Sequence, residues 1–169
     1  PESHACSSQA LYTTDSDYEK AWARAYLGYV YRDSFSYKYA ADMFREKYRL
    51  QPKADYFLLL GYLSLYEGGL IETVKEWEEN PITRPTPFVT PFLEARRAVA
   101  AGDTKEALQA LEGITFDPFT GDKFDQLEAE IIRADALLLA KDKRAKQHAI
   151  QAWYITPRNR RAAFLVEQV

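Results

Sequence analysis

The sequence has very few of the residues that bind metals, form disulfides or attack substrates. Among its 169 residues there are one cysteine, Cys6, and two histidines, His4 and His148. A single cysteine excludes a disulfide within the chain. His148 has Arg144 one helical turn before it and Ala152 one turn after it, so it lacks a metal-binding neighbour at the usual spacing. We therefore expect no metal site and no cofactor.

Long apolar runs and catalytic motifs are missing as well. The leucine runs at 58–60 and 137–139 are short, whereas a membrane-spanning helix needs roughly 20 apolar residues. The chain contains neither a glycine-rich phosphate loop nor a nucleophile elbow. These absences predict that the protein is not an enzyme and has no small-molecule substrate.

Acidic and basic residues are unevenly distributed along the chain. Residues 1–140 carry 15 Lys/Arg against 23 Asp/Glu, while residues 141–169 carry 7 against 2. A nucleic-acid-binding protein needs a broad positive face, so the acidic body argues against that class. The basic C-terminal part is consistent with a solvated helix end or with a contact to phosphate or lipid headgroups.

What the sequence does have is an internal repeat. Small residues recur at Gly28, Gly61 and Ala95, in steps of 33 and 34, and bulky ones follow sixteen residues later at Phe44, Trp77 and Leu111. A fourth, degenerate copy follows at a step of 38, with Arg133, Ala145 and Ala149 in the matching places. A period of this length indicates helix pairs that stack on their neighbours.

Residues that cap or interrupt helices predict where the helices begin and where none can form. Ser16 with Glu19 predicts a helix that begins near Asp17, and the prolines between 81 and 91 exclude a helix there. We predict a flexible tail at 1–15 and one helical repeat domain at 16–169. Its predicted parts are repeats at 21–53, 54–87, 88–121 and 122–157, followed by a capping helix at 159–168.

The pattern resembles the tetratricopeptide repeat family. The first copy carries the resemblance best, and its matching residues are Leu27, Gly28, Tyr31, Ala40, Phe44 and Pro52. The resemblance implies an all-α, right-handed α-solenoid of about four helix-turn-helix repeats, closed by the C-terminal helix. It also implies a concave groove lined by the first helix of each pair.

On this chain the groove positions are mostly aromatic and apolar. The expected partner-binding residues are Trp22, Tyr29, Arg32, Leu58, Tyr62, Leu65, Tyr66, Phe92 and Arg96. Tyrosine and tryptophan bury large areas at low entropy cost, so such a lining suits an extended or helical apolar peptide. The alternative is that these side chains pack between helices. The segment at 81–91 is a plain loop or a pseudo-ligand in the groove.

We expect a non-catalytic module that binds a protein or peptide, as a scaffold or assembly factor of a larger complex such as a bacterial envelope, pilus or secretion machine. The alternatives are a soluble secretion chaperone and an architectural segment of a longer solenoid. Cys6, preceded by Ala5 and followed by Ser7, resembles the start of a bacterial lipoprotein, so a lipid on Cys6 is the one expected membrane contact. The compartment stays open between cytoplasm and bacterial envelope, with Cys6 favouring the envelope.

Overall fold

The structure, a computed structural model, describes residues 15–115, 117 and 123–169. Every regular element within these ranges is an α-helix, and none of their residues forms a strand. The expected all-α class is therefore confirmed. Contacts divide the chain into two compact units, Pro1–Val89 and Thr90–Val169, which are described one at a time.

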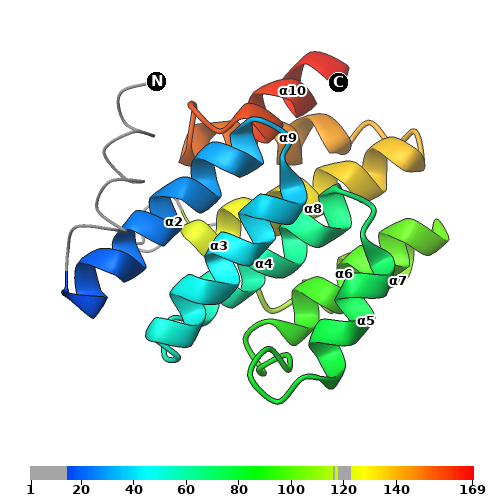
Figure 1. Cartoon of the computed structure of the whole chain (residues 1–169). Helices are drawn as coiled ribbons and strands as arrows, with labels where there is room; N and C mark the ends of the chain where they lie inside the picture. The colour runs from blue at the N-terminus through cyan, green and yellow to red at the C-terminus, as the bar shows by residue number, and fades with distance from the viewer. Residues whose placement is uncertain (1–14, 116, 118–122) are drawn as a thin grey trace. The chain divides into compact units, whose positions relative to one another are not determined.

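The first unit consists of helices joined by short turns. Their bounds are α2 Asp17–Asp33, α3 Tyr37–Leu50, α4 Asp55–Glu67 and α5 Ile71–Glu79. Each helix packs against the next one in the chain, which the blue-to-green part of Figure 1 shows. This is the arrangement that consecutive helix pairs predict.

Local chemistry sets the ends of these helices. The Ser16 hydroxyl oxygen accepts a hydrogen bond from the backbone N–H of Glu19 at 3.4 Å, and α2 begins at Asp17 as predicted. The turn after α2 places Phe35 at a φ of 61°, and the turn after α4 places Gly69 at 66°. The glycine adopts this left-handed conformation without the steric cost that a side chain brings.

Small residues let the helices of this unit approach one another closely. Gly28 on α2 faces the ring of Phe44 on α3, and Gly61 on α4 faces the ring of Trp77 on α5. Neither site has room for a Cβ atom unless the ring moves. The two glycine–aromatic pairs occupy equivalent places in the first and second predicted repeats.

The segment at 80–89 folds back on α4 instead of continuing as a helix, which agrees with its prolines. The Tyr62 hydroxyl donates a hydrogen bond to the Thr83 carbonyl at 2.8 Å. The Thr86 hydroxyl donates to a carboxylate oxygen of Asp55 at 3.0 Å. Because Asp55 and Tyr62 lie seven residues apart, the segment follows one face of α4 over two turns.

The second unit contains α6 Thr90–Ala101, α7 Thr104–Ala110, α8 Phe124–Leu139, α9 Ala145–Ile155 and α10 Arg160–Gln168. α6 packs on α7 and α8, α7 on α8, and α8 on α9. The spacing of Asp103 and Glu106 is that of a capping box, and Asp103 caps α7 by accepting from the Glu106 N–H at 2.9 Å. Gly102, in the turn before α7, has a φ of 76°.

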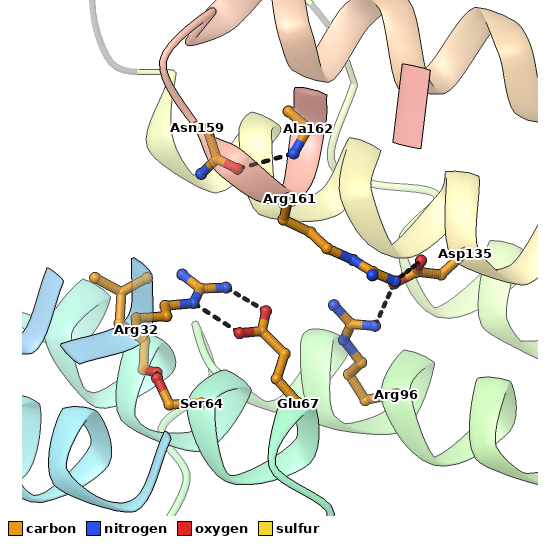
Figure 2. A network of polar contacts seen from close by, with 9 residues as sticks. Arg32, Ser64, Glu67, Arg96, Asp135, Asn159, Arg161 and Ala162 are labelled. Carbon is orange, nitrogen blue, oxygen red and sulfur yellow. Dashed lines mark hydrogen bonds and ion pairs between the residues drawn. The ribbon is translucent and has the colours of Figure 1, made fainter. Parts of the chain in front are cut away.

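The last helix closes the apolar edge of this unit, as the prediction of a capping helix requires. Asn159 caps α10 through the N–H of Ala162 at 2.9 Å (Figure 2). Buried residues of α8, α9 and α10 then form one apolar cluster: Leu127, Ile131, Ala134, Ala149, Ala152, Ala162 and Leu165.

The helix starts predicted near residues 17 and 159 lie within one residue of the observed starts of α2 and α10. The Thr90–Pro91 pair favours Thr90 as an N-cap residue, but Thr90 is instead the first residue of α6. The longer loop at 113–121, which absorbs the extra residues of the 38-residue step, lies partly outside the described residues, as do Cys6 and the tail up to residue 14. One continuous domain over 16–169 and a right-handed superhelix stay predictions. In the part of the chain that the structure describes, no helix has the length and apolar character required to cross a bilayer.

Candidate protein-binding surface

An exposed aromatic row runs along α2. Tyr18, Trp22, Tyr26 and Tyr29 are 63%, 48%, 43% and 37% exposed. Steps of four, four and three residues place side chains on one face of a helix. We call these four residues the α2 row. Two of them, Trp22 and Tyr29, belong to the predicted groove.

Rings beneath the α2 row fix its geometry. The Trp22 ring lies edge-on to Phe57 of α4 at a centroid distance of 6.1 Å and to Tyr18 at 6.2 Å. Tyr29 lies edge-on to the buried Phe44 of α3 at 5.3 Å. These distances and tilts are those of favourable aromatic pairs. The row is therefore held in place by the core of its unit.

A buried lysine lies below the same rings. The side chain of Lys47, 1% exposed, places Nζ 4.3 Å from the centroid of Trp22 and 4.9 Å from that of Phe57. It donates a hydrogen bond to Gln51 one turn later. Burial lowers the pKa of Lys47 below its ordinary value, because an apolar environment disfavours the charged form. Attraction to the ring faces acts in the opposite direction.

Arg32, near the C-terminal end of α2, already forms an ion pair with Glu67. Its Nε and Nη2 donate to the two carboxylate oxygens of Glu67 at 2.9 and 2.6 Å, as Figure 2 shows. Both side chains are only 11% exposed. This bidentate ion pair ties α2 to α4. Tyr66, next to Glu67, is half-buried.

Three further groove candidates are inside the first unit. Leu58, Tyr62 and Leu65 are at most 1% exposed. Tyr62 lies edge-on to Trp77 at 5.4 Å and is covered by the segment that begins at residue 80. The expectation that these three side chains are exposed is therefore wrong. The irregular segment at 80–89 folds over the helix face that carries Tyr62 and shields this side chain from solvent.

The groove candidates of the second unit are also buried. Phe92 is fully buried and Arg96 is 8% exposed. Arg96 Nη1 donates to Asp135 of α8 at 2.7 Å, and the other carboxylate oxygen of Asp135 accepts from Arg161 of α10 (Figure 2). Nε and Nη2 of Arg96 are buried without a hydrogen-bond partner among the described residues. Arg96 therefore has a structural role, which the sequence prediction missed.

A second charged cluster lies on α8. Glu130, 1% exposed, accepts from Arg133 one turn later, and its other oxygen is hydrogen-bonded to Nδ1 of His148 on α9. Arg133 also donates to the carbonyl oxygens of Leu111, at 2.6 Å, and of Ile114. The sequence shows Arg133 as a misfit in the fourth repeat, and these contacts explain how the misfit is accommodated. Among the described residues, no group of three His, Cys, Asp or Glu side chains is arranged to hold a metal ion.

No family model matches the chain, and neither a curated protein nor a solved structure is significantly similar to it.

Proposed function

We propose that this chain is a non-catalytic binding module that recognises another protein or a peptide through the α2 row. In this proposal the module is a tetratricopeptide-like, right-handed α-solenoid and serves as a scaffold or assembly factor of a larger complex. The observation that carries the proposal is the exposure of four aromatic side chains on one helix face.

The physical chemistry of the α2 row favours protein binding. Tyrosine and tryptophan are the commonest hot-spot residues of interfaces, because each buries a large area and keeps a hydrogen-bonding tip. Contacts of Trp22 with Phe57 and of Tyr29 with Phe44 restrict the rings before any partner arrives. Such preorganisation lowers the entropy cost of binding.

The charges around the row indicate what kind of partner it fits. Asp17, Glu19 and Asp33 on α2 are exposed, while Arg32 is neutralised by Glu67. The fully exposed charged side chains of α2 are thus acidic, whereas Lys20 and Arg24 of the same helix are half-buried. A helical or extended segment with apolar side chains and flanking Lys or Arg is complementary to the row.

The repeated close packing supports the tetratricopeptide-like part of the proposal. Gly28 with Phe44 and Gly61 with Trp77 reproduce one helix–helix contact at a step of 33 residues. In repeat proteins of this kind a small residue of the first helix receives a large one of the second. The adjacent packing of consecutive helices agrees with such a fold.

The experiment compares two doubly substituted proteins. Tyr18→Ala/Tyr26→Ala leaves in place Trp22 and Tyr29, the row residues whose rings lie against Phe57 and Phe44. Tyr39→Ala/Ile82→Ala removes two other side chains of the same unit, which are 64% and 55% exposed. Partners are captured from native extract, identified by mass spectrometry and then titrated as purified proteins, with circular dichroism as the check on folding.

The row variant is expected to bind the partner about 10- to 100-fold more weakly, while the control variant binds like the wild type. Equal binding by all three proteins contradicts the proposal. Concentration-dependent self-association without a partner favours an architectural segment. A captured protein that is insoluble unless co-expressed with the chain favours a secretion chaperone.

A further inference from the structure

The outward face of α9 combines aromatic and basic side chains. Ile150, Trp153 and Tyr154 are 45%, 45% and 59% exposed, although all three are large and apolar or amphipathic. Lys146, one turn before Ile150, is exposed as well. Steps of four, three and one residues keep these four side chains within one half of the helix circumference. We call them the α9 face.

The opposite side of α9 holds it in the second unit. Ala145, Ala149 and Ala152 are at most 2% exposed, and the latter two pack in the apolar cluster with α8 and α10. Small residues bring the helix axis close to its neighbours. The large side chains of α9 are therefore the ones directed outward, which reverses the usual pattern of an amphipathic core helix.

This part of the chain has little negative charge. Helix α9 contains no acidic residue. Asp142, the one acidic residue between 140 and 160, is bound to Arg144, whose Nη2 lies 2.7 Å from its carboxylate. The same stretch carries six basic residues: Lys141, Lys143, Arg144, Lys146, Arg158 and Arg160. The stretch that carries the α9 face is thus net positive. On α8, which packs against α9, Glu128 and Glu130 are buried and Asp125 is half-buried.

We infer that the α9 face binds an anionic lipid surface. Trp153 and Tyr154 have the amphipathic rings that concentrate at the headgroup level of bilayers, and Ile150 supplies an apolar group between them and Lys146. Lys143 and Lys146 reach lipid phosphates, and each basic residue near such a surface strengthens the attraction to it. The helix lies flat on the bilayer, because its alanine side stays packed on α8 and α10.

The residue types distinguish a lipid surface from an acidic protein. Protein interfaces are enriched in aromatic residues and arginine but depleted in lysine. Lys143 and Lys146, at the start of the α9 face, are exposed, and Nζ of Lys123 lies 6.0 Å from the centroid of the Tyr154 ring. The nearby Arg144 is engaged with Asp142. Aromatic residues together with lysine are typical of helices that lie on membranes. An 11-residue helix offers only about 16 Å of contact, so binding is reversible and sensitive to salt.

This inference concerns a different helix and a different unit from the α2 row. An experiment can therefore contradict one of the two proposals without contradicting the other. The test uses co-sedimentation of the whole chain with vesicles of phosphatidylcholine alone and with vesicles that contain about one third phosphatidylglycerol. Lys143→Glu/Lys146→Glu reverses two charges beside the aromatic residues. Lys38→Glu/Lys53→Glu makes the same change of net charge at two exposed positions of the first unit.

The wild type is expected to sediment with the anionic vesicles and not with the neutral ones, and to be released in about 0.5 M salt. The Lys143/Lys146 variant should bind at least about tenfold more weakly, and the Lys38/Lys53 variant within about threefold of the wild type. The inference is overturned if the wild type does not bind anionic vesicles, or if both variants lose binding equally. A protein partner that is lost with the Lys143/Lys146 variant, without any vesicle binding, also overturns it.

A second measurement tests insertion directly. Brominated lipids quench tryptophan fluorescence by contact, and the chain has three tryptophans: Trp22, Trp77 and Trp153. Trp153→Phe preserves an aromatic ring at a site that is 45% exposed, so folding is expected to survive. Quenching by brominated anionic vesicles should disappear in this variant. If the quenching persists, another tryptophan contacts the lipid and the assignment of the α9 face is wrong.

Discussion

Gly28 lies directly against the ring of Phe44: a Cβ atom on this glycine would come 2.6 Å from ring atom Cε1. One repeat later, a Cβ on Gly61 would come 2.7 Å from Cζ3 of Trp77. Carbon atoms do not approach this closely without displacement of one partner. The recurrence of a small residue before a large one is thus a requirement of close helix packing.

Gly28→Ala should therefore destabilise the protein even though alanine favours helices. The higher helix propensity of alanine contributes about 1 kcal/mol, whereas overpacking a filled core costs about 1–3 kcal/mol. We expect a net loss of about 1 kcal/mol or more in the free energy of unfolding, measured with urea. Gly113→Ala is the control, because nothing lies within 4 Å of a Cβ placed there. A Gly28→Ala protein more stable than the wild type would show that the Phe44 ring moves aside freely.

Asp135→Asn should be among the most destabilising single changes in the second unit. The substitution removes the charge that compensates Arg96, which is 8% exposed and hydrogen-bonds to no other described residue. Breaking one partner of a buried ion pair costs about 3–5 kcal/mol. Arg96→Met/Asp135→Leu removes both charges and should recover most of this loss. The surface pair Lys75–Glu72 provides the control, with an expected effect below about 1 kcal/mol.

Lys47→Met should leave stability within about 1.5 kcal/mol of the wild type, because the volume between Trp22 and Phe57 stays filled. The informative quantity is the pH dependence. The folded-state pKa of Lys47 is lowered, so between that pKa and 10.5 the unfolded chain binds more protons than the folded one. The wild type should therefore gain stability relative to the variant as pH rises towards 10.5.

Comparing the wild type with Lys47→Met separates the contribution of Lys47 to the pH dependence of stability from that of its neighbour Tyr48. Burial, followed by the charge of Asp55, raises the pKa of Tyr48, which lowers stability as pH rises above 10. That contribution is common to both proteins and cancels when they are compared. A stability difference that is independent of pH would mean that Lys47 keeps its ordinary pKa.

Arg144→Gln should raise the pKa of Asp142 towards its ordinary value. Hydrogen bonds from the Arg144 side chain and backbone lower the pKa of Asp142 from 3.8 to about 2. In the wild type, the stabilisation from this pair is present above pH 3.8 and is lost as pH falls through about 2. In the variant the carboxyl should titrate closer to 3.8, which carbon-detected NMR of Asp142 measures. An unchanged titration would show that the backbone N–H of residue 144 alone causes the shift.

The sequence was sufficient for the helices because their determinants are local. Ser16 and Asp103 cap helices through backbone N–H groups three residues away, contacts that the spacing to Glu19 and Glu106 predicts. Asn159 caps α10 in the same way, although the sequence predicted only that a helix begins near it. Prolines exclude the helix at 81–89, and Gly102 marks a turn. Small residues at a fixed step likewise predicted a close approach of the paired helices at Gly28 and Gly61, but not that Phe44 and Trp77 of the same pairs lie against these glycines.

The candidate site was less predictable because exposure depends on what folds over a helix. Tyr62 and Tyr29 occupy equivalent groove positions, yet the segment at 80–89 covers Tyr62, which is fully buried, while Tyr29 is 37% exposed. The spacing of residues along a helix does not show which helix face a later irregular segment will cover. Likewise, Arg96 was predicted to line the groove because Asp135, the carboxylate that it shares with Arg161, is distant in sequence. Tyr18 and Tyr26, which complete the α2 row, follow from the four-residue spacing around Trp22.

The carboxylate of Asp135 has a consequence for how the second unit comes apart. It joins α6 to α10, the first and last helices of that unit, through Arg96 and Arg161. In a simple array of repeats each helix pair contacts only the neighbouring pairs, so the terminal pair can unfold on its own. Here α10 cannot leave without changing the charge environment of Asp135, and with it the ion pair that holds α6. The two terminal helices therefore share one anionic contact, which links their stabilities although they are far apart in sequence.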